Sequence, residues 1–367
     1  MRVSKPPNGL QALQIYAGPR ARSVLSQRGL QAADVRVIPA AAGGAKGLVL
    51  LPLDRWLFAD WLRDSKQVLH MIGSSVGAWR MAVACLPDCE QALAQLGEDY
   101  ITQTYPREPG KMPTASTVSR VFGQVLQERL GVRADEVLSH PLRRLHVITS
   151  RGRGLLHKPG RARQALGWLG AAAANTLSRR SLGACMERVV FSDPRDPLPF
   201  GLNDYSPTQV RTLQPANLSS ALLASCSVPL ALEPVHDIAG GPMGSYWDGG
   251  ITDYHLHLNY AQMDAGLVLY PHFGPQVVPG WLDKPWNRRH AATPALDNLV
   301  LLCPHPDWVR QLPNAKLPDR GDFKRYGEDV AGRQRDWRLV LAKSQQLADE
   351  FAELVTAGRP VDALPLL

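Results

Sequence analysis

The sequence predicts an α/β fold, because short apolar strands are followed twice by a glycine-rich turn and an apolar helix. The first such unit covers residues 34–57, and the second covers residues 68–86 and ends at the helix-stopping Pro87. The apolar run that begins the second unit is typical of a strand covered on both faces. Further strands are expected at residues 145–149, 189–191, 266–270 and 299–302.

Five more segments have the composition of helices. Pro19 begins the first of them, which continues to about Gln27, because proline is favoured at the first position of a helix. The others are residues 118–130, an alanine-rich run that ends at Leu177, residues 218–226 and residues 333–354. We expect a loop over residues 104–116 and a proline-rich connection over residues 304–318.

The composition is that of a globular protein with a sizeable core, since 45% of the 367 residues are hydrophobic and 20% are charged. No apolar run approaches the roughly 18 residues of a membrane-spanning helix. The first residues lack the apolar segment of a signal peptide. The five cysteines, an odd number in a long chain, favour free thiols in a reducing compartment. We therefore expect a cytoplasmic protein, with peripheral membrane attachment as an alternative.

The formal net charge of +8 favours anionic partners. Much of this charge lies in one region of the sequence, which contains Arg143, Arg144, Arg151, Arg153, Lys158, Arg161 and Arg163. No zinc-finger or RNA-binding signature accompanies it, so nucleic acid is not expected as a partner. The alanine-rich run follows directly. Two interpretations stay open: a solvated face beside a packed helix, or peripheral association with an anionic membrane surface.

Residues 73–77, Gly-Ser-Ser-Val-Gly, fit the pattern G-x-S-x-G with Ser75 at its centre. A serine on a sharp turn between a strand and a helix needs small neighbours, which Gly73 and Gly77 provide. Its hydroxyl is then exposed at the end of the sheet, and the first helical turn offers free N–H groups to an oxyanion. The pattern predicts a nucleophilic serine, and an ordinary glycine–serine turn is the alternative.

The glycine-rich turn of the first unit reads Ala41-Ala42-Gly43-Gly44-Ala45-Lys46-Gly47. Glycines let the backbone approach a ligand and direct successive N–H groups at a negative charge. The spacing differs from that of a P-loop and from that of the dinucleotide motif G-x-G-x-x-G. A lysine near a helix start opposes the helix dipole, so we expect Lys46 to have a specific partner there.

A third motif, Asp248-Gly249-Gly250, follows a strand-like Ser-Tyr-Trp run. Asp-Gly is common in turns, so a simple turn is one interpretation. The preceding strand would place Asp248 at a carboxyl end of the sheet, where α/β proteins form their clefts. Asp248 is therefore a candidate for the active site.

In order and content, these three motifs resemble the patatin-like phospholipase family. That family has a G-G-G-x-(Lys/Arg)-G oxyanion loop, a G-x-S-x-G nucleophile elbow and a D-G-(G/A) aspartate. Residues 224–229, Ala-Ser-Cys-Ser-Val-Pro, are similar to its Ala-Ser-x-x-x-Pro segment, and the resemblance covers about residues 35–270. Ala42 departs from the pattern by replacing the first glycine. Where that position requires a positive φ, alanine costs about 1 kcal/mol or more.

The resemblance implies a three-layer α/β/α fold with a mainly parallel central sheet. The patatin-like acyl hydrolase domain would cover residues 34–300, between an N-terminal helical extension (1–33) and a proline-rich linker with a C-terminal helix packed on the domain (301–367). The implied reaction is hydrolysis of a lipid or fatty-acyl ester by a dyad of Ser75 and Asp248, without a metal or another cofactor. The enzyme would be of the phospholipase A, lysophospholipase or carboxylesterase type. The implied oxyanion hole is Gly43, Gly44 and Ala45, and the supporting motif residues are Lys46, Gly47, Gly73, Gly77, Gly249 and Gly250.

Two other functions stay open. A conventional Ser–His–Asp esterase is compatible with the chain order, with His255, His257 or His272 as the base. The first two of these histidines do not by themselves form a metal site. The second function is a non-catalytic lipid-binding protein that keeps the fold, and Ala42 is its only support.

Overall fold

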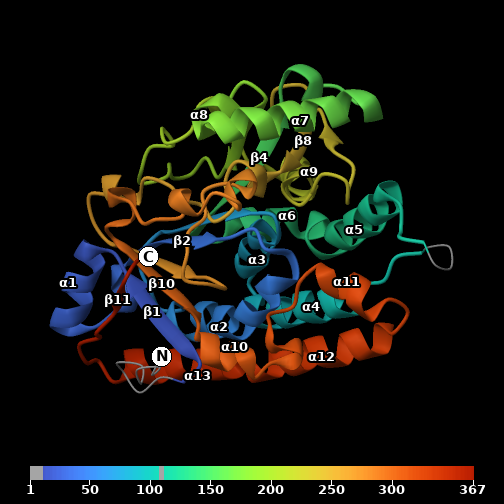
Figure 1. Ribbon diagram of the computed structural model, residues 1–367. Helices are drawn as coiled ribbons and strands as arrows, with labels where there is room; N and C mark the ends of the chain where they lie inside the picture. The colour runs from blue at the N-terminus through green and yellow to red at the C-terminus, as the bar shows by residue number, and fades with distance from the viewer. Residues whose placement is uncertain (1–10, 107–110) are drawn as a thin grey trace.

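The computed structural model describes residues 11–106 and 111–367, and within them the strands form one mixed sheet (Figure 1). Its strand order is β11-β1-β10-β9-β2-β3-β4-β5-β6, with β8 also paired to β4 and β7 to β8. Part of the expected loop at residues 104–116, namely 107–110, lies outside the described residues.

The centre of the sheet is parallel. Pairing runs in parallel from β10 through β9, β2 and β3 to β4. These strands are almost entirely buried and, apart from β4, mainly apolar, as expected for a sheet covered on both faces. Their bounds are Val35–Ala40 for β2, Leu69–Ser74 for β3, Arg143–Gly152 for β4, Leu267–Pro271 for β9 and Leu299–Pro304 for β10.

Antiparallel pairing appears towards both edges. Strand β1 runs antiparallel to β10 and parallel to β11, while β5 runs antiparallel to β4 and parallel to β6. Strand β8, antiparallel to β4, ends at Asp248. The bounds of these strands are Leu13–Ala17 for β1, Met186–Ser192 for β5, Thr208–Thr212 for β6, Val235–His236 for β7, Ser245–Asp248 for β8 and Leu364–Pro365 for β11.

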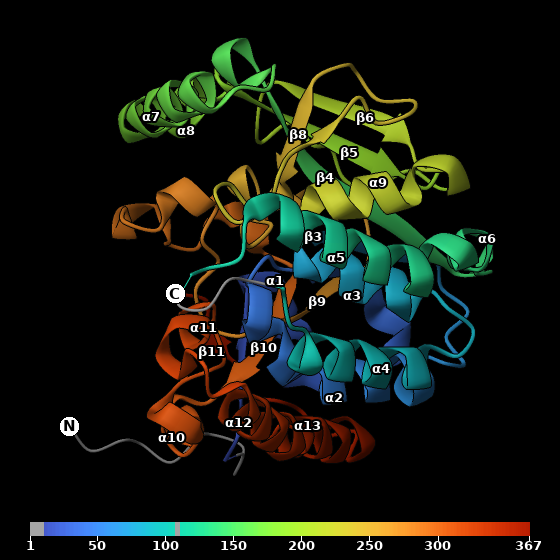
Figure 2. The same cartoon turned by 90° about the vertical axis from the view of Figure 1, so that its right-hand side faces the viewer.

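Helices cover this sheet (Figures 1 and 2). Helix α3 packs against β2, β3 and β4, α9 packs against β4, and α1 contacts β10. The three-layer α/β/α fold with a mainly parallel sheet is thereby confirmed. The helices are α1 (Pro19–Arg28), α2 (Leu51–Trp56), α3 (Val76–Ala84), α4 (Cys89–Thr102), α5 (Ala115–Arg129), α6 (Ala134–Ser139), α7 (Arg161–Leu177), α8 (Arg179–Leu182), α9 (Pro215–Ser225), α10 (Pro306–Arg310), α11 (Gly321–Tyr326), α12 (Val330–Lys343) and α13 (Gln345–Thr356).

The prediction of a helix directly after the first glycine turn is wrong in detail. The segment Gly44–Leu50 is a 3-10 helix, and the chain becomes α-helical only in α2. The single helix expected at residues 333–354 is two helices, α12 and α13, that meet at Ser344. The Ser344 hydroxyl donates to the carbonyl of Val340, a local bond that competes with helix continuation.

The basic region of the sequence is not one surface. Arg143 and Arg144 are buried in β4, where Arg143 donates to the carbonyls of Ala84 and Phe58 and Arg144 pairs with Asp196. Of the remaining residues, Arg153, Lys158 and Arg163 are exposed.

In the part of the chain that the structure describes, every helix is too short or too polar to cross a membrane.

A buried ion pair joins α2 to α3, the helix that follows Ser75. The Arg80 guanidinium donates to both carboxylate oxygens of Asp54, at 2.7 and 2.9 Å, and neither residue is more than 1% exposed. Such a bidentate pair satisfies both groups where water cannot reach them.

We expect Asp54→Ala to lower the free energy of unfolding by about 3–5 kcal/mol, because it leaves the Arg80 charge buried without a partner. Chemical denaturation measures this change. Glu90→Ala, which removes the exposed pair with Arg55, is the matched control and should change stability by less than about 1 kcal/mol. Equal losses in the two variants would contradict the role assigned to the buried pair.

Candidate active site

Ser75 occupies a strained turn between β3 and α3. Its backbone has φ 55° and ψ −135°, a conformation that L-residues rarely adopt. The flanking glycines are required by space: a Cβ on Gly77 would lie 2.0 Å from the carbonyl oxygen of Ala40, and one on Gly73 would lie 2.5 Å from Cα of Ala78. This is the sharp strand-to-helix turn expected of a nucleophile elbow, which places the serine hydroxyl at the end of the sheet.

Asp248 meets Ser75 at the end of β8. The Ser75 hydroxyl donates to Oδ2 of Asp248 at 2.6 Å, and the N–H of Gly250 donates to Oδ1 at 2.7 Å. Both Ser75 and Asp248 are 5% exposed. Burial raises the pKa of Asp248 to about 6, although the hydrogen bond from Ser75 and the charge of Arg320 oppose this increase. A carboxylate with that pKa is ionised at neutral pH and is basic enough to accept a proton.

The glycines after Asp248 are required by close packing. A Cβ on Gly249 would lie 2.2 Å from the carbonyl oxygen of Ile148 in β4. A Cβ on Gly250 would lie 2.7 Å from the Cβ of Ala42. The turn therefore fits between the sheet and the glycine loop, which brings two of the three sequence motifs into contact.

The glycine loop lies beside Ser75. A Cβ on Gly43 would lie 2.4 Å from the ring of Phe273, and Gly44 has a φ of 56°, which favours glycine. A 3-10 helix begins at Gly44, so the first N–H groups of this turn have no acceptor within the helix. Gly43 and Gly44 line a cavity together with Ser75, whereas Ala45 is buried and is not part of that lining.

Ala42 is not strained by replacing a glycine. Ala42 is not one of the described non-glycine residues that have a positive φ. Its N–H donates to the carbonyl of Tyr254 at 2.9 Å, and its methyl group packs against Tyr254 and Val278. The condition under which alanine would be costly at this position is therefore not met.

The three candidate histidines bond elsewhere. Nδ1 of His255 contacts the backbone of Gln276 and Val278, Nδ1 of His272 contacts Gly274, and Nε2 of His257 contacts Thr293. Burial lowers the pKa of each, that of His272 to about 3. In the described part of the chain, no hydrogen bond joins a histidine to Ser75 or Asp248.

Ser225 is a positioning residue that the motif search did not single out. Its hydroxyl accepts the N–H of Ser75 at 2.8 Å and donates to the carbonyl of Ile148 at 2.7 Å. It thereby ties the strained turn to β4. The only available signal was its place in the Ala-Ser-Cys-Ser-Val-Pro segment.

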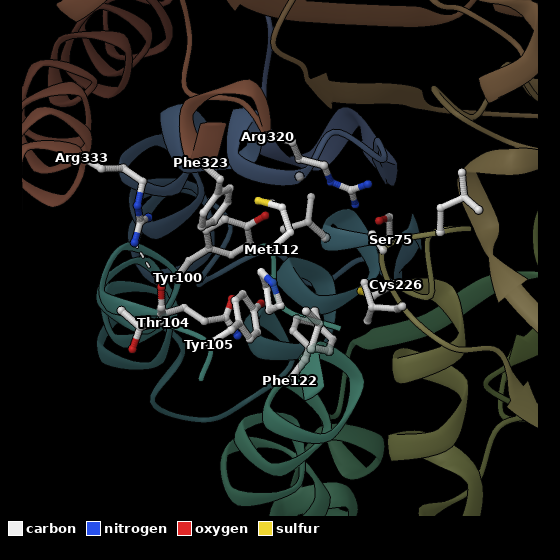
Figure 3. Close-up of a pocket in the computed structure, with 18 of the residues that line it drawn as sticks. Ser75, Tyr100, Thr104, Tyr105, Met112, Phe122, Cys226, Arg320, Phe323 and Arg333 are labelled. Carbon is white, nitrogen blue, oxygen red and sulfur yellow. Dashed lines mark hydrogen bonds between the residues drawn. The ribbon is translucent and has the colours of Figure 1, made fainter. Parts of the chain in front are cut away.

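Two cavities meet at Ser75. The larger, about 520 Å³, has a mainly apolar and aromatic wall that includes Val76, Trp79, Tyr100, Tyr105, Phe122, Leu232 and Phe323. Figure 3 shows this space with Ser75 and Arg320 at one end. The smaller, about 440 Å³, is more polar and is lined by Lys46, Asp248, Tyr254, Trp281, Lys284 and Asp319, among others. Gly44, Ser75, Pro229 and Arg320 line both cavities.

The described residues contain no group of three or more His, Cys, Asp or Glu side chains arranged to hold a metal ion. The five cysteines are free thiols, and four of them are buried. The polar groups that line the smaller cavity with Ser75 include the Asp248 carboxylate, the glycine loop and cationic side chains. This set can accept a proton from the serine and stabilise negative charge near it.

Comparison with known proteins identifies a family for the chain. The family model for patatin-like phospholipase matches residues 41–255, more than half of the chain. A search of curated proteins found no match. Among solved structures, VipD from Legionella pneumophila is similar at 13% sequence identity, with a TM-score of 0.39, over 89% of this chain and 67% of that one. On the family match, the chain belongs to the patatin-like phospholipase family.

Proposed function

We propose that this protein hydrolyses lipid acyl esters through an acyl-Ser75 intermediate, with Asp248 as the general base. The observation that carries this proposal is the 2.6 Å hydrogen bond from Ser75 Oγ to Asp248 Oδ2, placed where an apolar and a polar cavity meet. Membership of a family of lipid acyl hydrolases supports the reaction class.

In the first half of the reaction, Ser75 Oγ attacks the ester carbonyl carbon while its proton passes to Asp248. The carbonyl oxygen becomes an oxyanion, for which the free N–H groups of the glycine loop at Gly43, Gly44 and Ala45 are the proposed donors. Each such donor typically contributes about 3 kcal/mol. Collapse of the tetrahedral intermediate breaks the ester C–O bond, and the proton on Asp248 passes to the departing alcohol.

In the second half, water attacks the acyl-Ser75 carbonyl and gives a proton to Asp248. Breaking the acyl–oxygen bond releases the fatty acid, and the proton returns from Asp248 to Ser75 Oγ. The apolar cavity suits the acyl chain throughout, since it is lined by Trp79, Phe122 and Phe323 and is within the size range of small-ligand sites.

The geometry favours this dyad over the two other functions. A triad needs a histidine within hydrogen-bonding reach of the serine. His255 and His272 instead contact backbone groups through Nδ1 and are held neutral by burial, and among the described residues Nε2 of each has no hydrogen-bond partner. A non-catalytic role was supported by Ala42 alone, and Ala42 is unstrained.

Helix α7 supports a proposed attachment to anionic membrane surfaces. Leu166, Leu169 and Leu177 on this helix are 60–82% exposed, and the exposed Lys158 and Arg163 lie at its N-terminal end. An exposed apolar helix face beside basic residues suits the interface of an anionic bilayer, where acyl chains and phosphate groups lie close together.

We expect Ser75→Ala to abolish ester hydrolysis and labelling by a fluorophosphonate, while Ser74→Ala largely retains both.

Asp248→Asn should nearly abolish acylation because it removes the base. Single changes of His255, His257 and His272 to alanine should retain substantial turnover when the variant is folded. A folded histidine variant as inactive as Ser75→Ala would favour the triad instead.

The raised pKa of Asp248 gives a pH prediction for activity and stability. Hydrolysis should fall as pH drops below about 6, because the base becomes protonated.

The same raised pKa affects stability. Asp248 contributes its full stabilisation below about pH 4, and this contribution is lost as pH rises through about 6. Asp248→Asn should therefore raise the free energy of unfolding at pH 7.5, on the order of 3 kcal/mol, and raise the melting temperature with it. Both increases should be much smaller at pH 4. The exposed Asp264→Asn is the control, and an Asp248→Asn melting temperature at or below wild type at pH 7.5 would contradict the assignment.

For membrane attachment, we expect the protein to co-sediment with vesicles that contain anionic lipid, and binding to weaken with salt. Exposed charges are screened over about 10 Å at roughly 0.1 M salt. Leu166→Glu combined with Leu169→Glu should weaken binding, whereas Leu339→Glu, on the exposed side of α12, should not. Vesicle binding that responds to neither salt nor anionic lipid would exclude this surface.

A further inference from the structure

We propose that Arg333, at the end of the apolar cavity remote from Ser75, binds a carboxylate at the far end of the acyl chain, so that the preferred substrates are esters of dicarboxylic acids. This inference rests on the proposed function and adds to it the chemistry of the acyl group. It makes Arg333 a specificity-determining residue that takes no part in the bond-breaking steps.

Arg333 and Ser75 line the same cavity, which has a volume of about 520 Å³. Figure 3 shows Ser75 at one end of it, beside Arg320, and Arg333 at the other. The rings of Tyr105 and Phe323 lie between these ends. An acyl chain that is attached to Ser75 and extends along this space therefore directs its last carbon atoms towards Arg333.

The Arg333 guanidinium is buried and has few partners. Arg333 lies on α12 and is 3% exposed. Of the five N–H groups of a guanidinium, one on Nη2 donates to the carbonyl of Gln103 at 3.1 Å. Among the described residues, Nη1 has no hydrogen-bond partner and Arg333 forms no ion pair. The guanidinium therefore has hydrogen-bonding capacity that the fold does not use.

Two aromatic rings are the main surroundings of this charge. The guanidinium carbon of Arg333 lies 4.6 Å from the centres of both the Phe323 and the Trp337 rings. The nearby carboxylate of Asp322 is engaged elsewhere, since it pairs with Lys316 at 2.7 Å and accepts a hydrogen bond from Trp337 at 3.0 Å. Burial lowers the pKa of Arg333, although arginine keeps its proton in proteins. A carboxylate would supply the missing counter-charge, and its two oxygens match the fork of a guanidinium.

The contact between α12 and α4 explains only part of this arrangement. Gln103 directly follows α4, so its bond from Arg333 satisfies a carbonyl at the end of that helix. An uncharged side chain makes a similar contact beside it, because Gln334 donates to the carbonyl of Thr102 at 3.5 Å. A charge in an apolar wall is thus more than this contact requires, and it points to an anionic ligand.

The fold fixes the separation of Ser75 and Arg333, so the preference should depend on the length of the acyl chain. A chain that is too short leaves its carboxylate in the apolar part of the cavity without a partner, which is costly. A chain that is too long cannot lie extended between the two residues. We therefore expect the preference for a carboxylate end to be greatest at one chain length.

Pairs of p-nitrophenyl esters with equal numbers of acyl carbons test the proposal, one ester of each pair ending in a carboxylate and the other in a methyl group. In wild type at neutral pH, the ratio of the two kcat/KM values should favour the carboxylate ester and be highest at one chain length. Arg333→Met should lower that ratio about tenfold, the effect expected for a lost hydrogen bond to a charged group. Arg333→Lys keeps a charge without the planar fork and should give an intermediate ratio. Partial unfolding lowers both kcat/KM values and cancels in the ratio.

Two variants on the same helix are matched controls. Gln334→Met removes the neighbouring bond to the end of α4, and Arg335→Met removes an exposed positive charge. Gln334 and Arg335 are not among the described residues that line the cavity. Both variants should keep the wild-type ratio.

The possible outcomes separate this inference from the proposed function. Failure of wild type to cleave any ester of the series would contradict the hydrolase itself. Cleavage with the methyl-ended ester preferred at every chain length would overturn only the carboxylate site. A ratio unchanged in Arg333→Met, or an equal drop in Arg335→Met, would also overturn only that site.

A free fatty acid is the other possible source of a carboxylate. The free acid of the methyl-ended ester, added as a competitor, should inhibit wild type and Arg333→Met equally. Inhibition that weakens in Arg333→Met but not in Arg335→Met would show that Arg333 binds a free fatty acid. That result would overturn the assignment to the substrate.

Discussion

The close approach of helix α3 to strand β2 is the constraint on which the site depends. At Gly77 the carbonyl of Ala40 occupies the space that a side chain would need. Because the helix lies so near the sheet, the chain must turn from β3 into α3 within one residue, and Ser75 takes a positive φ. The bond from its N–H to Ser225 holds that conformation. The strain is thus maintained by packing around the serine, and it leaves the hydroxyl directed at Asp248.

Burial then gives the carboxylate its basicity. A solvent-exposed aspartate is a weak base, with a pKa of about 4, whereas desolvation raises the pKa of Asp248 to about 6. Nearby histidines also have low pKa values, so a pH profile alone does not separate a carboxylate base from an imidazole. What distinguishes them is geometry, since the Ser75 hydroxyl donates to the Asp248 carboxylate and, among the described residues, to no histidine.

Much of the fold could be read from the sequence because its signals are local. Glycine turns between apolar runs predicted β2, β3 and α3. The family resemblance added that the central sheet is mainly parallel. Strand β1 was missed, since its pairing with β10 joins segments almost 300 residues apart and leaves no local pattern. The burial of Arg143 and Arg144 was also invisible, because a strand with two arginines at its start resembles a solvated one until its carbonyl partners are known. Lys284 and Arg320 carry no motif at all, and only the folded chain brings them to Ser75.

Lys284 and Arg320 both follow the segment that matches the family, while the serine, the aspartate and the glycine loop lie within it. The lining of the polar cavity therefore comes from separate stretches of the chain, with Lys46 inside the matched segment and Lys284 and Arg320 after it. Loops tolerate substitution better than the sheet elements they connect. A substitution in the turn after Asp283 would change the lining of the polar cavity and leave the hydrogen bond between Ser75 and Asp248 in place. The lining of the polar cavity can therefore change without a change in the residues that hydrogen-bond to Ser75.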